Sequence, residues 1–311
     1  LEQAAKRANK KHATKLLEWA AQLADSTANI KARINLACSR HVAGIARIYP
    51  QRDWETTSTR SLMLIERELA AFSTWYEYFP RSCVYDGKTH GTFKDAAKQL
   101  PLIHKMGFNI VYFPPIHPVG REFRKGKNNT LSPSSEDVGS PWAVGAKEGG
   151  HKSILPALGR LEDFQHFLEE AEMRGMEVAL DIAFQCAPDH PWVKKHPEWF
   201  RWRPDGTVQY AENPPKKYQD ILPINFESDD WKNLWDELKS VFEYWIEQGV
   251  KVFRVDNPHT KSMEFWRWCI LNIKAKHPEV IFLAEAFTRP KRKYLLAKSG
   301  FTHGYTYFTW R

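Results

Sequence analysis

The sequence lacks the marks of several protein classes. Its four cysteines (Cys38, Cys83, Cys186 and Cys269) are scattered without metal-ligand spacing, so we expect reduced thiols, a cytoplasmic location and neither a metal nor a cofactor. No apolar run is long enough to cross a bilayer and no signal-peptide pattern is present, so no membrane partner is expected. The glycine-rich motifs GxGxxG and GxxxxGK(S/T) are also missing, which disfavours a nucleotide-binding doubly wound sheet.

The net charge of +8 comes in part from a basic cluster near the start of the chain: Lys6, Arg7, Lys10, Lys11 and Lys15. No recognised nucleic-acid module accompanies this charge, so we interpret it as a solvated surface and expect no nucleic-acid partner. The 13 tryptophans are many for this length. They suit a carbohydrate site, where indole rings stack on sugar faces, although most tryptophans in any chain belong to the core.

Residues 1–50 are predicted to form a helical segment. Leu16 and Leu23 belong to an apolar stripe with helical spacing, and Pro50 closes the segment. Residues 51–74 are expected to be the end of a small β domain, because residues 56–71 alternate in part between apolar and polar, as a strand does. Since the chain starts with leucine and ends directly after an aromatic run, we expect it to be part of a longer protein.

Six apolar strands alternate with helical patterns from residue 75 onward. The strands are expected at Trp75–Ser82, Phe108–Pro115, Glu177–Phe184, Gly249–Asn257, Val280–Phe287 and Gly304–Trp310. Repeated strand–helix units predict an α/β fold with a parallel sheet, and residues 75–311 are expected to form an incomplete (β/α)8 TIM barrel with about six of its strands. Long loops at 117–158 and 187–228 leave the carboxyl ends of strands, where barrel enzymes keep their active sites.

Two carboxylates lie near the ends of neighbouring predicted strands. Asp256 ends one strand, and Arg254 lies on the same side of it because side chains alternate with a period of two. Glu285 lies in the next strand, in an apolar setting that raises a carboxyl pKa. A retaining glycosidase or transferase needs two carboxyl groups about 5–5.5 Å apart, and here Asp256 suits the nucleophile and Glu285 the general acid/base. The alternative is an Arg–Asp pair that only stabilises a strand end.

Two segments, Phe253–Lys261 and Leu283–Pro290, resemble the nucleophile and acid/base strands of the α-amylase superfamily. Five more resemble one branch of it, the α-1,4-glucan:maltose-1-phosphate maltosyltransferase family: Trp75–Ser82, Arg124–Asn129, Asp181–Trp192, Asn213–Asp220 and Gly304–Arg311. The motifs occur in the family's order, and the resemblance covers residues 56–311.

The resemblance implies a retaining transfer of maltosyl from α-maltose 1-phosphate to the non-reducing end of an α-1,4-glucan, with release of phosphate, in glycogen biosynthesis. By motif position it implies Asp256 as nucleophile and Glu285 as general acid/base, in a cytoplasmic homodimer. It places seven residues near the substrate: Lys125, Gln185, Asn213, Lys216, Tyr218, Arg254 and Asn257. Lysines on loops suit this reaction, because a phosphate leaving group needs positive charge more than a proton.

Two features depart from the superfamily pattern. Where amylase-type hydrolases usually carry an Asn-His pair, this chain has Gln185 and Cys186, which disfavours an ordinary amylase. His190 stays open as a packing residue or a ligand. The chain also ends before the strand near which the superfamily carries a third aspartate, so we expect this chain by itself to be inactive.

Two alternatives to maltosyl transfer stay open. One is another enzyme on the same barrel, an α-glucan hydrolase or a trehalose-forming isomerase. The other is a non-catalytic glucan-binding relative, whose aromatic side chains would bind sugar without turnover.

Overall fold

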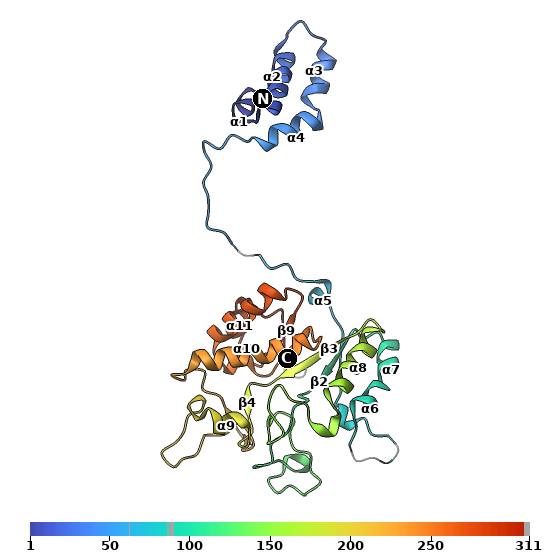
Figure 1. The fold of residues 1–311 in the computed structure, drawn as a ribbon, viewed down its shortest axis with the longest axis vertical. Coiled ribbons are helices and arrows are strands. Elements are labelled where there is room, and N and C mark those ends of the chain that lie inside the picture. Colours follow the sequence, from blue (N-terminus) through green and yellow to red (C-terminus); the bar gives the residue numbers. More distant parts are fainter. Residues whose placement is uncertain (62, 86, 88–89, 308–311) are drawn as a thin grey trace. The chain divides into compact units, whose positions relative to one another are not determined.

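The structure, a computed structural model, describes residues 1–61, 63–85, 87 and 90–307. It divides into two compact units, Leu1–Met63 and Leu64–Arg311 (Figure 1). None of the described helices is both long and apolar enough to cross a membrane.

The first unit is helical over the residues that the structure describes. Its helices are α1 (Glu2–Arg7), α2 (Lys10–Ala24), α3 (Ile30–Ala37) and α4 (Arg40–Ile48). Asn9, Asn29 and Ser39 precede α2, α3 and α4, and each accepts a hydrogen bond from a backbone amide in the first turn, as N-cap residues do. Leu16, from the predicted apolar stripe, is fully buried and packs near Ile45 in the core of this unit.

The strand predicted within residues 56–71 is not found among the described residues. Residues 56–61 and 63–67 have no regular structure, and Glu68–Ala71 forms the short helix α5. A strand persists only when a neighbour shares its backbone hydrogen bonds, and no described strand pairs with this segment. The assignment of residues 51–74 to a β domain therefore remains a prediction.

The second unit is built on a six-stranded parallel sheet that curls into part of a barrel (Figure 1). In spatial order its strands are β1 (Trp75–Glu77), β2 (Ile110–Phe113), β3 (Glu177–Ile182), β8 (Val252–Val255), β9 (Ile281–Glu285) and β10 (His303–Tyr305). The predicted α/β class with a partial (β/α)8 barrel is confirmed, and each strand overlaps the segment predicted for it. Residues 308–310 of the last predicted strand lie outside the described residues.

Helices connect the strands and pack on the outer face of the curled sheet; in the view of Figure 1, α6 to α8 lie to the right and α10 and α11 to the left. Their bounds are α6 (Phe93–Ala97), α7 (Leu100–Lys105), α8 (Leu161–Glu172), α9 (Pro191–Lys195), α10 (Trp231–Glu247), α11 (Met263–Lys276) and α12 (Pro290–Lys298). Gly249, with φ of 100°, ends the α10 turn in a backbone conformation that favours glycine, and β8 follows three residues later.

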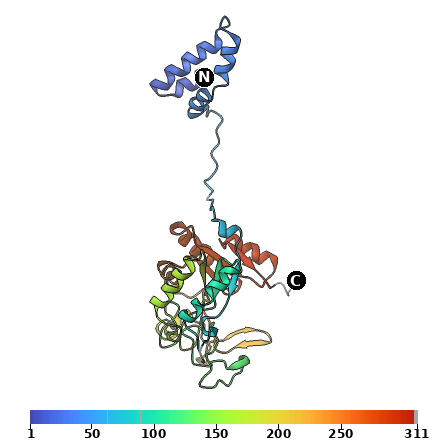
Figure 2. The same ribbon diagram turned by 90° about the vertical axis from the view of Figure 1, so that its right-hand side faces the viewer.

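Short strands outside the main sheet lie near its carboxyl end. They are the antiparallel pair β4 (Gln185–Cys186) and β7 (Leu222–Pro223), and the hairpin of β5 (Ala211–Asn213) and β6 (Lys216–Tyr218). In Figure 2 this yellow-orange hairpin extends outward above the green loop that contains residues 117–158. Single 3-10 turns occur at Pro80–Ser82, Lys127–Asn129, Pro156–Leu158, Pro197–Trp199 and Pro258–Thr260.

Alternate residues of each strand face opposite sides of the sheet. On one side Phe113, Phe253 and Phe282 pack against the helices in the main core. A smaller apolar cluster lines the other, inner side: Ile110, Tyr112, Ala179, Val252 and Ile281. The inner residues nearest the carboxyl ends of the strands are polar or charged, and they build the site described next.

The long loop over residues 117–158 is packed although it contains no strand. Val119 and Val144 are buried and form an antiparallel bridge across it. The amide of Ala187 donates to the oxygen of Val144 at 2.7 Å, which fixes the loop to the segment after β4. The loop therefore presents its side chains to the carboxyl end of the sheet from a defined backbone.

Candidate active site

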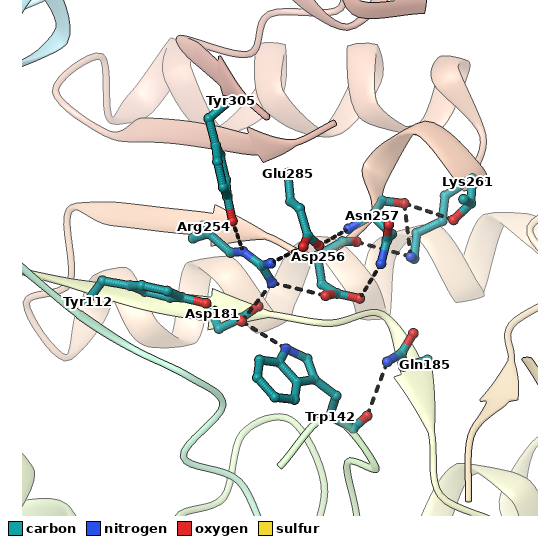
Figure 3. A network of polar contacts seen from close by, with 11 residues as sticks. Tyr112, Trp142, Asp181, Gln185, Arg254, Asp256, Asn257, Lys261, Glu285 and Tyr305 are labelled. Atoms are coloured by element: carbon teal, nitrogen blue, oxygen red, sulfur yellow. Dashed lines mark hydrogen bonds and ion pairs between the residues drawn. The ribbon is translucent and has the colours of Figure 1, made fainter. Parts of the chain in front are cut away.

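Four charged side chains meet at the carboxyl end of the barrel sheet (Figure 3). Asp181 belongs to β3, Arg254 to β8 and Glu285 to β9, and Asp256 follows β8 directly. The period of two places them on the inner face, and the register aligns Asp181 with Arg254. Each of the four residues is at most 6% exposed, so water screens their charges little.

Arg254 contacts all three carboxylates. Its Nη1 donates to Asp181 Oδ2 at 2.8 Å and to Asp256 Oδ1 at 2.9 Å. Its Nη2 lies 2.6 Å from Glu285 Oε1, and its Nε donates to the hydroxyl of Tyr305 at 3.2 Å. One guanidinium thus holds the predicted nucleophile and the predicted acid/base side by side. This favours the short carboxylate spacing of retaining enzymes over the separation of about 6.5–9.5 Å in inverting ones.

Glu285 is suited to hold a proton near neutral pH. Its pKa rises from the ordinary 4.5 to about 8, mainly because it is buried; the charge of Asp256 adds to the rise and Arg254 opposes it. Burial also raises the pKa of Asp181, again with Arg254 opposing. A carboxyl group that stays protonated beside a second carboxylate is what a general acid requires.

A tight turn follows Asp256. Asn257 adopts a left-handed conformation (φ 41°, ψ 51°), which asparagine tolerates better than most residues. Its backbone N–H donates to Glu285 Oε2 at 3.2 Å, and its side-chain amide donates to Asp256 Oδ2 at 3.4 Å. Lys261 closes the turn by donating to the main-chain oxygens of Asp256 and Asn257. The structure therefore brings Asn257 to both carboxylates and adds Lys261, which is not among the predicted site residues.

Asp181 collects further donors that sequence reasoning missed. Its Oδ2 accepts from the hydroxyl of Tyr112 at 2.6 Å and from Trp142 Nε1 at 3.0 Å, while its Oδ1 is buried without a described partner. Gln185 reaches this group indirectly, because its side-chain amide donates to the oxygen of Trp142 at 3.2 Å. The alternation that selects Arg254 also selects Tyr112 and Asp181, whereas the irregular loop around Trp142 offers no such pattern.

The β5–β6 hairpin carries three of the predicted substrate residues. Tyr218 faces the carboxylates: burial raises its pKa, and the charges of Asp256 and Glu285 add to the rise. Asn213 and Lys216 pair at the exposed tip of the hairpin. The hairpin therefore brings Tyr218 toward the pair, with Asn213 and Lys216 farther out.

Lys125 fixes the hairpin to the long loop. It is 5% exposed, and its ammonium donates to the oxygen of Lys217 at 3.3 Å and to the side chain of Gln219. Over the described residues, no hydrogen bond or ion pair joins Lys125, Asn213 or Lys216 to the Arg254 network.

Asp220 is a further polar residue that sequence reasoning missed. It is 2% exposed, and neither of its carboxylate oxygens has a described partner. Burial raises its pKa and the charge of Lys125 opposes the rise. Buried carboxylates are normally hydrogen-bonded, so a hydroxyl group of a ligand would satisfy oxygens that the described protein leaves without donors.

His190 is a packing residue. It is 1% exposed, its Nδ1 accepts from the amide of Trp192 at 3.0 Å, and its Nε2 lies 3.2 Å from His151 Nδ1. A Cβ added at Gly145 or Gly150 would collide with its ring. Burial lowers the pKa of His190 to about 3, so it is neutral at ordinary pH and joins the long loop to the start of α9.

Within the described ranges, His196, Glu198 and Asp230 have potential ligand atoms within 4.8 Å of one another. His196 Nδ1 lies 3.1 Å from Glu198, and Asp230 accepts from Trp199 Nε1 at 2.9 Å. These atoms already have protein partners, so we assign no metal to them.

Sequence comparison finds relatives of one name. An α-1,4-glucan:maltose-1-phosphate maltosyltransferase from Methylacidiphilum infernorum is 57% identical over 297 residues, which cover 95% of this chain and 44% of that protein. A protein of the same name from Chlorobaculum tepidum is 57% identical over 90% of this chain and 42% of its own length. The chain thus spans less than half the length of these curated relatives. No family model matches it.

Solved structures of amylases share the fold. An α-amylase from Lactobacillus plantarum is 26% identical with a TM-score of 0.58, over 74% of this chain and 48% of that one. A maltogenic α-amylase from Thermotoga neapolitana is 27% identical with a TM-score of 0.57, over 72% and 47%. The resemblance to the α-1,4-glucan:maltose-1-phosphate maltosyltransferase family, on an α-amylase type of barrel, is thereby confirmed over 95% of this chain.

Proposed function

We propose that this chain carries the catalytic pair of a retaining maltosyltransferase. The enzyme moves maltosyl from α-maltose 1-phosphate to the non-reducing end of an α-1,4-glucan and releases phosphate. The observation that supports this most is the bridging of Asp256 and Glu285 by Arg254, in a chain 57% identical to a protein of that name. The resemblance further implies a role in glycogen biosynthesis by a cytoplasmic homodimer, and four free cysteines favour that location.

The first half-reaction forms a covalent maltosyl-enzyme. A carboxylate oxygen of Asp256 attacks the anomeric carbon, and the bond from that carbon to the phosphate oxygen breaks. Glu285, protonated because of its raised pKa, gives its proton to the departing phosphate. Arg254 orients both groups, which lowers the entropic part of the barrier.

The second half-reaction transfers maltosyl to the glucan. The 4-hydroxyl of the acceptor's terminal glucose attacks the anomeric carbon, and its proton passes to Glu285, now a carboxylate. The bond from the anomeric carbon to Asp256 breaks, which restores the free nucleophile. Two inversions at one carbon give net retention of configuration.

The remaining predicted residues are proposed to bind the donor. Tyr218 and Asn257 lie near the carboxylates, and we propose that they donate hydrogen bonds to the phosphate. Lys216 and Asn213 lie farther out on the hairpin, where a point charge would attract an anionic donor. Lys125 is proposed to contribute to donor binding by holding the hairpin in place through its bond to the oxygen of Lys217.

Gln185 is proposed to contact the sugar next to Trp142, which occupies the same side of the site (Figure 3). Asp220, with both oxygens unpartnered among the described residues, is proposed to accept hydrogen bonds from sugar hydroxyls. Both assignments give the sugar an uncharged or hydrogen-bond-accepting partner and leave the phosphate to Tyr218, Asn257 and the lysines of the loops.

An α-glucan hydrolase is the second candidate, because solved structures at 26% and 27% identity are α-amylases. The two reactions share the first covalent step and differ in the second, where water replaces the glucan hydroxyl. They also differ in the donor, because a hydrolase acts on unphosphorylated glucan.

The test is phosphate release by the full-length protein from α-maltose 1-phosphate, with and without a malto-oligosaccharide. We expect phosphate that depends on the acceptor, and products that grow by two glucose units. A folded protein that releases no phosphate under either condition would overturn the proposal. Sugar release from unphosphorylated glucan would then favour the hydrolase.

A further inference from the structure

The catalytic cluster contains a second cation, Lys261, for which the mechanism above has no step. Its side chain reaches back across the turn after β8, and its ammonium donates to the main-chain oxygens of Asp256 at 3.1 Å and Asn257 at 3.2 Å (Figure 3). Over the residues that the structure describes, it forms no ion pair with a carboxylate. Because its ammonium donates to two carbonyl oxygens, Lys261 stabilises the backbone of the turn and does not neutralise a carboxylate.

The first of these bonds acts on the peptide group between Asp256 and Asn257. The oxygen of this group accepts from Lys261, and its N–H donates to Glu285 Oε2 at 3.2 Å. A charged donor on the oxygen polarises the peptide and strengthens its N–H as a donor, particularly where water is excluded. Lys261 thus reaches Glu285 through a single peptide group.

The second bond holds the turn in its unusual conformation. The oxygen of Asn257 accepts from Lys261, from the hydroxyl of Thr260 at 2.8 Å and from the amide of Thr260 at 3.2 Å. Asn257 is left-handed, a conformation that persists in a residue other than glycine only when its surroundings hold it. Without Lys261 the Asn257 oxygen keeps its bonds to Thr260, but the oxygen of Asp256 loses its donor. The peptide group between Asp256 and Asn257 is then held less firmly with its N–H toward Glu285.

We propose that Lys261 is a positioning residue that fixes the peptide after the nucleophile, and with it the hydrogen bond that Glu285 receives. The inference rests on the proposed function, because it uses the roles given to Asp256 and Glu285. Because both acceptors of the Lys261 ammonium are backbone oxygens of the turn, we expect loss of Lys261 to act on the chemical step more than on donor binding.

Lys261 also adds to the electrostatic surroundings of Glu285. The other titratable groups that face Glu285 are Asp181 from β3, Arg254 from β8, Asp256 directly after β8, His259 in the turn that follows, and the tyrosines at positions 218, 305 and 307. Arg254 and Lys261 are the cations among these groups. A general acid works while protonated, so the rate falls as pH rises through its pKa. Loss of a cation and of a polarised donor raises that pKa and moves the falling limb to higher pH.

The experiment compares Lys261→Met with the unmodified full-length protein, with Lys261→Arg as the conservative variant. Lys251→Met is the matched control, because Lys251 is an exposed lysine just before the other end of β8. Phosphate release from α-maltose 1-phosphate is measured across pH. For Lys261→Met we expect kcat to fall about tenfold, a nearly unchanged KM for the donor, and a falling limb at higher pH. Lys261→Arg restores part of kcat, and Lys251→Met changes nothing.

A lower kcat with an unmoved pH limb would overturn the inference, since Lys261 would then only stabilise the fold. A raised KM at unchanged kcat would overturn it too, by making Lys261 a binding residue. If Lys261→Met does not fold, Lys261→Gln, which keeps a donor without the charge, replaces it in the same comparison. An unmodified protein that releases no phosphate would instead overturn the proposed function. A crystal structure of Lys261→Met then decides the inference, which is wrong if the bond from Asn257 to Glu285 persists.

Discussion

Two arginine–carboxylate pairs lie at opposite ends of β3, and they differ in burial. At the carboxyl end, the side chains of Asp181 and Arg254 are 0% and 5% exposed. At the amino end, Glu177 and Arg67 are 27% and 23% exposed and are joined at two points, with Nη2 2.7 Å from Oε2. One strand thus carries the same kind of ion pair in two different environments.

The difference shows which features distinguish an ion pair of the candidate active site from one that only stabilises the fold. Arg67 pairs with one carboxylate, and both charged groups are partly exposed to solvent. Arg254 serves three carboxylates away from water, so the cluster holds more negative than positive charge and favours keeping a proton. Barrel enzymes place function at the carboxyl end of the strands and stability at the amino end, and the two pairs follow that division.

The largest effect is expected from Asp256→Asn, which removes the nucleophile and keeps the shape of the side chain. Phosphate release should fall by orders of magnitude while the protein stays folded by circular dichroism. Glu177→Gln, at the other end of the sheet, is the matched control and should leave the rate nearly unchanged. An Asp256→Asn protein that keeps most of its activity would remove Asp256 from the mechanism. If the unmodified protein shows no turnover and Asp256→Asn keeps its affinity for glucan, the protein is instead a non-catalytic glucan-binding relative.

The next largest effect is expected from Arg254→Met, measured as the free energy of unfolding in denaturant. The change leaves three buried carboxylates without their cation, and breaking a buried pair in this way costs about 3–5 kcal/mol. Activity should be lost as well, because Asp256 and Glu285 lose their common partner. A loss below about 1 kcal/mol would mean that water enters the cluster and the burial contrast between the two pairs is not what matters.

The barrel was predictable because its strands are buried on both faces and read as short apolar runs between helical patterns. The strand expected within residues 56–71 was wrong over the described residues, because alternation alone does not supply a pairing partner. Strand formation is decided by neighbours that lie far away in the sequence, and a local pattern cannot report them.

The site was predictable where a regular strand carries it. Arg254, Asp256 and Glu285 follow from the period of two and from the order of the strands. Trp142 was not predictable, because it lies in an irregular loop and reaches Asp181 only after folding. The contact of Lys261 with the backbone of its own turn has no pattern in residue types, because any side chain with a donor of that length could make it.

The pH dependence of stability is expected to show an effect that is smaller for each pH unit. The pKa of Glu285 is about 8 when folded and about 4.5 when unfolded, so between these pH values the folded state binds the proton and the unfolded state does not. The free energy of unfolding should therefore fall as pH rises through this window, by at most about 1.4 kcal/mol per pH unit. Glu285→Gln should remove that part of the slope in denaturant titrations at several pH values. The matched Glu177→Gln should keep it, and an unchanged slope in Glu285→Gln would mean that another group carries the proton.

The smallest effect is expected at the amino end, from Arg67→Met. Both partners are about a quarter exposed, so the pair gains little over its separate hydration and is screened by salt; its loss should cost about 0–1 kcal/mol. A double-mutant cycle with Glu177→Gln, run at low and high salt, measures the coupling without the cost of a stranded charge. A coupling free energy between Arg67 and Glu177 above about 2 kcal/mol that does not change with salt would mean that this pair behaves like the buried pair. In that case the number of carboxylates around Arg254, and not its burial, would be what distinguishes the carboxyl end of β3.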